Sequence, residues 1–258
     1  MAASLYREIK GKGQPLVLLH GWGMHGGVWG SFADQLAQEF ELHLVDLPGY
    51  GFSRDMESDY SLPAYRAELE RLLASFDEAV TLTGWSLGGL LALDFLQQDN
   101  SKVDKVIFIA STPCFTRKTD WQCAMDETVF DNFASELQQD YRKTLKRFLA
   151  LQTRGSEMAK EELKCMNKNL FARGEPEITA LKQGLEILKT ADLRRNHINT
   201  PALIIAGEKD TLVPLKAAGE YTAMFDTARI EMIKGAGHAP FLSHTGQCVE
   251  SIKHFIHE

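Results

Sequence analysis

One serine in this chain has the neighbours that a nucleophile needs. The segment Gly84-Trp85-Ser86-Leu87-Gly88 fits the pattern G-x-S-x-G, follows the apolar run 80–83 and opens a helical pattern over 90–97. Between a strand and a helix, this pattern predicts a sharp turn that exposes the serine hydroxyl. Glycine suits the turn because a side chain there would collide with nearby backbone. We therefore predict that Ser86 is the nucleophile of an acyl transfer.

A serine hydroxyl is a weak nucleophile, so it needs a base and an acid that orients the base. In folds with this turn, the order along the chain is serine, acid, histidine. Asp210 comes just past one apolar, strand-like run, and His238 comes just past the next. We predict that His238 is the general base and that Asp210 is its acid, with Glu208 and Asp192 as alternatives for the acid.

The tetrahedral intermediate of acyl transfer carries a negative oxygen that N–H donors must stabilise. One donor is the residue after the nucleophile, Leu87, and the other comes from the loop after an early strand. The loop His20-Gly21-Trp22-Gly23 has that position, so we predict the Trp22 N–H as the second donor. We expect no metal ion and no organic cofactor, because this chemistry needs neither.

These residues must be positioned by a sheet, and the sequence predicts one. From residue 15 onward, short apolar runs alternate with longer helical patterns, which is typical of βαβ units and a mostly parallel sheet flanked by helices. The expected strands are 15–19, 41–46, 79–84, 103–110, 201–207 and 229–234. The carboxyl ends of such strands lie at one edge, where ligands bind in open sheets.

The segment between about residues 112 and 191 lacks strand-like sequence and contains amphipathic helical patterns, such as 134–151 and 157–170. Because strand-like sequence returns at 201, we interpret this segment, here called the cap, as a helical insertion over the carboxyl edge of the sheet. We expect residues 1–258 to form a single α/β domain of the α/β-hydrolase fold with this helical cap.

The composition is that of an ordinary globular protein, with 258 residues, 44% hydrophobic residues and a formal net charge of −7. We expect no nucleic-acid partner, and no membrane insertion because no apolar run approaches about 18 residues. The N-terminal segment lacks an apolar signal core, and the four cysteines are irregularly spaced. We therefore expect a cytoplasmic enzyme with reduced cysteines, and we expect it to be a monomer.

Several longer strings narrow the prediction further. They are the loop 20–23, LVDLPG at 44–49, GWSLGG at 84–89, RFLALQT at 147–153, GLEILKT at 184–190, DTLVP at 210–214 and HAPF at 238–241. With these strings, nearly the whole chain resembles the family of carboxylesterases that cleave pimeloyl-[acyl-carrier protein] methyl ester in biotin synthesis. The two cap strings, at 147–153 and 184–190, are the most specific part of this resemblance.

The resemblance implies hydrolysis of that methyl ester with release of methanol, and an acyl-carrier protein as partner. The positions that match the family's substrate contacts are Trp22, Ser86, Leu87, Phe148, Leu149, Ala150, Leu151, Gln152 and His238. Some cap positions that are typically arginine in the family are lysine here, among them Lys143, Lys160 and Lys164. Lysine keeps the charge but loses the bidentate fork of arginine.

The charge of one segment of the cap points to an acidic partner independently of the resemblance. Between residues 142 and 173 there are nine basic and three acidic residues, in a chain whose net charge is −7. Lys160 and Lys164 have helical spacing, and Lys143 and Arg147 form a similar pair. We predict that these four residues dock the carrier protein. The alternative is a solvated helix surface.

Other functions can share the same scaffold, because fold and triad do not fix the substrate. The nearest alternatives are a broad short-chain carboxylesterase and a carbon–carbon bond hydrolase. A non-catalytic ligand receptor is a further alternative, which an intact triad disfavours. Epoxide hydrolase and haloalkane dehalogenase chemistry is disfavoured because it requires a carboxylate where Ser86 stands.

Overall fold

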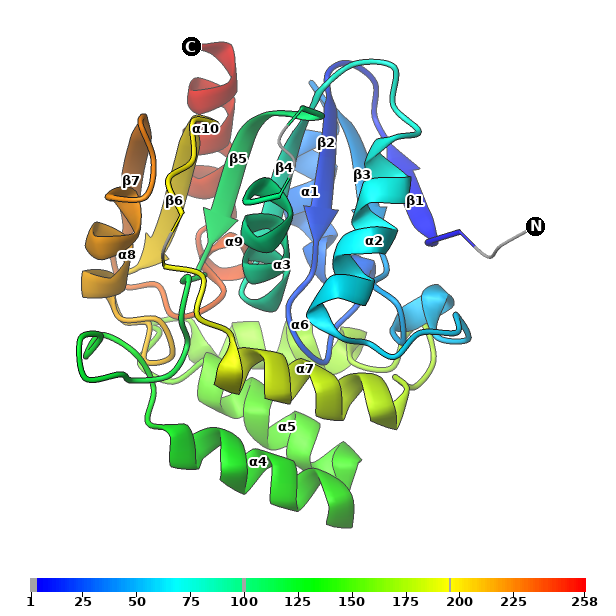
Figure 1. Ribbon diagram of the computed structural model, residues 1–258, viewed down its shortest axis with the longest axis vertical. Helices are drawn as coiled ribbons and strands as arrows, with labels where there is room; N and C mark the ends of the chain where they lie inside the picture. The colour runs from blue at the N-terminus through cyan, green and yellow to red at the C-terminus, as the bar shows by residue number, and fades with distance from the viewer. Residues whose placement is uncertain (1–3, 99–100, 195) are drawn as a thin grey trace.

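The computed structural model of the chain (Figure 1) describes residues 4–98, 101–194 and 196–258. Within these residues the sheet has seven strands in the order β1-β3-β2-β4-β5-β6-β7. β1 pairs with β3 in antiparallel register, and every other neighbouring pair is parallel. The strands are β1 (Arg7–Lys10), β2 (Pro15–Leu19), β3 (Glu41–Val45), β4 (Val80–Trp85), β5 (Val103–Ile109), β6 (Ala202–Gly207) and β7 (Ala228–Ile233). The mostly parallel sheet predicted from the sequence is confirmed.

Helices cover both faces of the sheet (Figure 1). α2 (Leu62–Leu73) and α3 (Leu87–Leu96) pack together on one face, and α1 (Gly30–Leu36) and α10 (Thr245–His257) pack together on the other. Every residue of β4 and β6 is buried for this reason. Shorter elements complete the architecture: the 3₁₀ turns η1 (Gly26–Trp29) and η2 (Gly51–Ser53), and the helices α8 (Leu215–Thr222) and α9 (Pro240–Ser243).

The cap supplies four helices between β5 and β6, and they lie beyond the carboxyl ends of the parallel strands (Figure 1). They are α4 (Glu127–Gln139), α5 (Tyr141–Gln152), α6 (Ala159–Asn169) and α7 (Ile178–Thr190). This placement puts helical side chains over the strand ends where the predicted site residues lie. None of the described helices is both long and apolar enough to cross a membrane.

Two local features differ from the sequence prediction. The pattern 134–151 was predicted as one helix, and this is wrong: α4 ends and α5 begins at Asp140, whose backbone is extended (φ −154°, ψ 90°). The Asp140 side chain accepts from the Lys143 N–H at 3.0 Å, so helix capping interrupts the amphipathic pattern. β1 was not predicted, because a four-residue edge strand with mixed polar residues carries little periodic signal.

Candidate active site

Ser86 lies in a strained turn between β4 and α3. Its φ of 54° falls in the left-handed region that residues other than glycine rarely adopt. A Cβ on Gly84 would lie 2.5 Å from the Gly88 carbonyl carbon, and a Cβ on Gly88 would lie 2.3 Å from the Leu19 carbonyl oxygen. The glycines of the motif are therefore required by close backbone approach, and the turn presents the hydroxyl at the sheet edge.

The structure brings the three predicted triad side chains together. The Ser86 hydroxyl donates to His238 Nε2 at 2.9 Å, and His238 Nδ1 donates to Asp210 Oδ2 at 2.8 Å. The other carboxylate oxygen of Asp210 accepts from the Leu212 N–H at 2.8 Å and the Val213 N–H at 3.0 Å. Because both oxygens are engaged, the carboxylate is fixed in place and holds the imidazole tautomer whose free lone pair faces the hydroxyl.

The two alternative acids point elsewhere. Glu208 accepts from the Gly235 N–H at 3.0 Å, at the base of the loop that carries His238. Asp192 pairs with Arg194 at 2.6 Å, where the cap returns to the sheet. The hydrogen bond between His238 Nδ1 and Asp210 Oδ2 therefore favours Asp210 as the partner of the histidine.

The two predicted oxyanion donors lie at the same end of the sheet. Leu87 is the first residue of α3, so its N–H has no acceptor within the helix and is available for a ligand. Trp22 follows β2, whose last residue, Leu19, pairs with Gly84 in the parallel register next to the nucleophile turn. This arrangement suits a pair of donors on either side of the Ser86 hydroxyl. The role of the Trp22 and Leu87 N–H groups as oxyanion donors stays a prediction.

His20 shapes the loop that contains Trp22 and is not aimed at a substrate. Its Nδ1 donates to the Gly21 carbonyl at 2.9 Å, and its Nε2 accepts from the Leu47 N–H at 3.0 Å. Complete burial lowers the pKa of His20 to about 4. The ring is therefore neutral at physiological pH, which lets it act as donor and acceptor at once.

Two buried side chains that the sequence analysis did not assign to the site help to hold it. The Trp85 indole N–H donates to the His238 carbonyl at 2.8 Å, and its ring contacts Phe241 edge-on at 5.1 Å between centroids. The Ser111 hydroxyl donates to the Ser86 carbonyl at 2.8 Å. The position of Trp85 directly before the nucleophile is the sequence signal that could have found it, whereas no motif marks Ser111.

The cap closes over these residues. The Trp22 indole N–H donates to the Leu181 carbonyl of α7 at 2.9 Å, and its ring meets Phe148 of α5 edge-on at 4.7 Å. The Gln152 carbonyl accepts from the His238 N–H at 3.2 Å. Ser86 and His238 are only 2% and 1% exposed. The reactive atoms are therefore largely enclosed beneath the cap.

The five cap residues predicted as substrate contacts do not share one face of α5. Phe148, Leu149 and Gln152 are buried against the core. Ala150 is exposed, and Leu151 is half-buried. Helical geometry explains the difference, since consecutive residues point about 100° apart around the axis. Only Phe148, Leu149 and Gln152 therefore face inward.

Comparison with known proteins agrees with this geometry. A family model described as alpha/beta hydrolase fold matches residues 14–245. A protein from Xanthomonas axonopodis pv. citri is 45% identical over 254 residues, and one from Xylella fastidiosa is 43% identical over 256 residues, each alignment covering 98% of both chains. Both proteins are named pimeloyl-[acyl-carrier protein] methyl ester esterase. This chain belongs to the same family.

Solved structures support the fold of this esterase family member. An esterase from Exiguobacterium antarcticum aligns with a TM-score of 0.87 at 24% identity, covering 98% of this chain and 96% of that chain. A bromoperoxidase from Bacillus anthracis aligns with the same TM-score of 0.87 at 23% identity, covering 98% and 95%. The predicted family and the predicted α/β-hydrolase fold are both confirmed.

The four residues predicted to dock a carrier protein in this esterase are all exposed. Lys143 and Arg147 lie on α5, and Lys160 and Lys164 lie on α6. Arg147 forms an ion pair with Glu136 of α4 and lies 5.2 Å from the centroid of the Phe133 ring. The charge of Arg147 is therefore partly neutralised by Glu136, whereas the three lysines are exposed on the helix surface.

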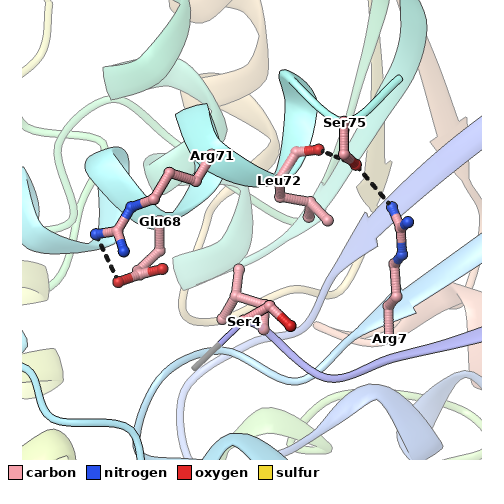
Figure 2. Close-up of a pocket in the computed structure, with 7 residues that line it drawn as sticks. Ser4, Arg7, Glu68, Arg71, Leu72 and Ser75 are labelled. Carbon is pink, nitrogen blue, oxygen red and sulfur yellow. Dashed lines mark hydrogen bonds and ion pairs between the residues drawn. The ribbon is translucent and has the colours of Figure 1, made fainter. Parts of the chain in front are cut away.

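Other parts of the described chain do not compete with this site. Among the described residues, no group of three or more His, Cys, Asp or Glu is arranged to hold a metal ion. A hollow of about 230 Å³ lies between β1 and α2, and Figure 2 shows its polar side chains turned toward one another. There Arg7 donates to the Ser75 hydroxyl at 3.2 Å, and Arg71 pairs with Glu68 at 2.8 Å. None of its lining residues was predicted for catalysis.

Proposed function

We propose that this chain hydrolyses the methyl ester of pimeloyl-[acyl-carrier protein] in biotin biosynthesis, giving pimeloyl-[acyl-carrier protein] and methanol. The observation that carries the chemistry is the hydrogen-bonded series Ser86, His238 and Asp210 under a closed cap. The substrate rests on relatives of that name that are 43–45% identical over 98% of the chain.

The acylation step begins at Ser86. Its oxygen attacks the ester carbonyl carbon while His238 Nε2, 2.9 Å away, takes the hydroxyl proton. The N–H groups of Trp22 and Leu87 stabilise the oxyanion that forms on the carbonyl oxygen. As the intermediate collapses, His238 returns the proton to the leaving methoxide, and methanol departs.

Asp210 acts through the histidine ring. Its carboxylate lies 2.8 Å from His238 Nδ1 and is anchored by two backbone N–H groups. This contact keeps the Nδ1 proton in place, so Nε2 can accept one, and it stabilises the imidazolium that results.

Deacylation repeats the same proton transfers with water. His238 removes a proton from a water molecule, the hydroxide attacks the acyl-Ser86 carbonyl, and the proton goes to the serine oxygen as the ester bond breaks. The free carboxylate of the pimeloyl chain leaves on its carrier. These steps use side chains and backbone N–H groups only, so we propose that the enzyme needs no cofactor.

We further propose that the cap binds the acyl chain and the carrier. Phe148, Leu149 and Gln152 face the site from α5, and Ala150 and Leu151 stay predicted contacts on the more exposed side of that helix. Lys143, Arg147, Lys160 and Lys164 form the docking surface for the acidic carrier. Residues 1–258 then form one domain in which the cap, at about 112–191, supplies specificity.

A cytoplasmic location and a monomeric state are also proposals. All four cysteines are free in the structure, which fits a reducing compartment. Neither nucleic acid nor membrane is proposed as a partner.

A direct comparison of substrates tests the proposed function. The kcat/KM for pimeloyl-[acyl-carrier protein] methyl ester should exceed that for free monomethyl pimelate, and the gene should restore growth of a biotin auxotroph that lacks this esterase. Equal kcat/KM for free and carrier-bound esters, together with failure to restore growth, would identify a general carboxylesterase instead.

A further inference from the structure

Arg173 links the cap to the core beneath it. It lies in the connection from α6 to α7, and its side chain is only 10% exposed. Its Nη1 donates to Asp46 Oδ1 at 2.9 Å, and the guanidinium also pairs with Glu8 of β1. The group lies 5.4 Å from the ring centroids of both Tyr6 and Phe52. Such a guanidinium is fixed by charge and by aromatic faces together.

Asp46 connects this arginine to the first residue of η1, where the loop that contains Trp22 ends. Asp46 follows β3 and is 0% exposed. Its Oδ1 also accepts from the Gly26 N–H at 2.7 Å, and its Oδ2 accepts from the Phe52 N–H at 2.9 Å. Gly26 belongs to the stretch 20–27, here called the oxyanion loop, which contains Trp22. One buried carboxylate therefore holds both the oxyanion loop and the cap arginine.

The cap touches the oxyanion loop at two further points. A Cβ on Gly27 would lie 3.3 Å from Arg173 Nε, so the arginine packs directly on the loop. His25 Nε2 donates to the carbonyl of Asn169, the last residue of α6, at 2.7 Å, while its Nδ1 accepts from the Gly27 N–H at 3.0 Å. Residues 25–27, which follow the predicted donor Trp22, thus contact the cap through a hydrogen bond and through packing.

We propose that Arg173 is a positioning residue for the oxyanion hole, and that it acts through Asp46. Because Arg173 belongs to the cap, it fixes the oxyanion loop only while the cap is packed against the core. Closure of the cap and completion of the oxyanion hole are therefore coupled. The inference rests on the proposed serine-esterase mechanism, with Trp22 N–H as a donor.

The physical reason is the charge of Asp46. With Arg173 in place, the buried carboxylate has a cationic partner and two backbone donors. Without the arginine, an unbalanced charge stays buried, which is strongly unfavourable. The loop then relaxes to admit water or to reposition its N–H groups, and the Trp22 donor moves from the geometry that stabilises an oxyanion.

The test compares Arg173→Met with Arg194→Met as a matched control. Arg194 is also largely buried, pairs with Asp192 and Asp120, and lies 5.3 Å from the Trp121 ring centroid, away from the oxyanion loop. Kinetics are measured on free monomethyl pimelate, so carrier docking plays no part. Inhibition is measured with a trifluoromethyl ketone, which forms a tetrahedral oxyanion on Ser86, and with the matching methyl ketone, which does not.

We expect Arg173→Met to lower kcat by about 10- to 100-fold, less than the effect of deleting an oxyanion donor outright, with KM within about threefold. Ki for the trifluoromethyl ketone should rise by the same factor as kcat/KM falls, while Ki for the methyl ketone stays constant. Arg194→Met should leave kcat and both Ki values unchanged. Glu8→Gln, which keeps the contact between Arg173 and Asp46, should also keep kcat.

Two further variants keep the proposal open to refutation. If Arg173→Met does not fold, Arg173→Gln, which removes the charge beside Asp46 but keeps a hydrogen-bond donor, must still show a selective loss for the trifluoromethyl ketone. The double variant Arg173→Met/Asp46→Asn must lose less than the product of the single losses. A lower melting temperature with unchanged kcat and Ki, or fully multiplicative losses, would overturn the proposal. Because free ester is the substrate, failure to act on the carrier-bound ester would refute the proposed function separately.

Discussion

Ser86 and His238 share one proton, since the hydroxyl and Nε2 lie 2.9 Å apart. We therefore expect Ser86→Ala and His238→Ala each to remove most of the hydrolysis of free methyl esters without unfolding the protein. The double variant should be about as slow as either single variant, because groups that act as a unit give non-additive losses. Steady-state kinetics and circular dichroism check this expectation, and a double variant much slower than both singles would contradict it.

Asp210 should matter almost as much as the histidine that it orients. The Asp210→Asn variant offers an N–H to Nδ1, favours the wrong tautomer and should lower kcat by about 10⁴-fold, by analogy with serine proteases. Glu208→Gln is the matched control, because that carboxylate accepts from the Gly235 N–H. Near-normal kcat in Asp210→Asn, or a comparable loss in Glu208→Gln, would reassign the acid.

Because His20 is buried, the free energy of unfolding should depend on pH. Its pKa falls from 6.5 to about 4 on folding, because burial disfavours the charged ring. The unfolded chain thus binds a proton at higher pH than the folded chain does. The contribution of neutral His20 to the free energy of unfolding is fully present above about pH 6.5 and is lost as pH falls toward about 4. Burial lowers the pKa of His25 as well, which acts in the same direction.

We therefore expect the free energy of unfolding in urea to be level near neutral pH and to fall between about pH 6.5 and pH 4. His20→Gln, which keeps an acceptor near the Leu47 N–H, should show a shallower fall. Unfolding curves at several pH values measure both slopes. An equal slope in the variant would show that His20 does not contribute.

The elements that carry the triad were predictable from sequence because their signals are local. β6 is a continuous apolar run, and β4 alternates apolar residues with threonines; both strands are buried on both faces. The glycines around Ser86 mark the turn, and the order of acid and histidine follows from the order of the strands. The one-helix prediction for 134–151 failed because Asp140 caps a new helix, a side-chain effect that outweighs periodicity.

Other features could not be predicted because they join residues distant in sequence. The contact of Arg173 with Asp46 spans 127 positions, and that of Trp85 with the His238 carbonyl spans 153. Neither has a motif, since each depends on how the cap and the loops pack. Resemblance likewise gave five cap contacts, but only the folded α5 shows that Ala150 lies on the outer face.

Helices α5 and α6 carry the proposed docking surface. We expect the double variant Arg147→Glu/Lys164→Glu to reduce kcat/KM for the carrier-bound ester by about 10-fold or more at low salt, because steering depends on complementary charge. The loss should shrink as salt rises. Hydrolysis of free monomethyl pimelate should be unchanged.

Lys12→Glu is the control for charge reversal alone. Lys12 is exposed in the turn before β2, at the amino end of the strands and away from the cap. Its reversal should leave kcat/KM for both esters unchanged. If the cap variant loses equally on both esters, or loses nothing on the carrier-bound one, then α5 and α6 present only a solvated surface.

The whole molecule combines a net charge of −7 with a basic segment, residues 142–173, inside the cap. An acidic partner is therefore attracted to that segment, which favours approach over the strand ends. Those same cap helices enclose Ser86, which is 2% exposed. The approach of a partner and access to Ser86 therefore both depend on the cap. Through the contacts of Arg173, the conformation of the oxyanion loop depends on the cap as well.

The most direct test of the account is to trap the covalent intermediate. The enzyme is mixed with pimeloyl-[acyl-carrier protein] methyl ester, quenched in acid within milliseconds and analysed by peptide mass spectrometry. The account predicts an ester adduct on Ser86 that carries the pimeloyl chain with its carrier, together with methanol release, and no adduct in Ser86→Ala. Turnover of the carrier-bound ester by Ser86→Ala, or an adduct on another residue, would contradict it.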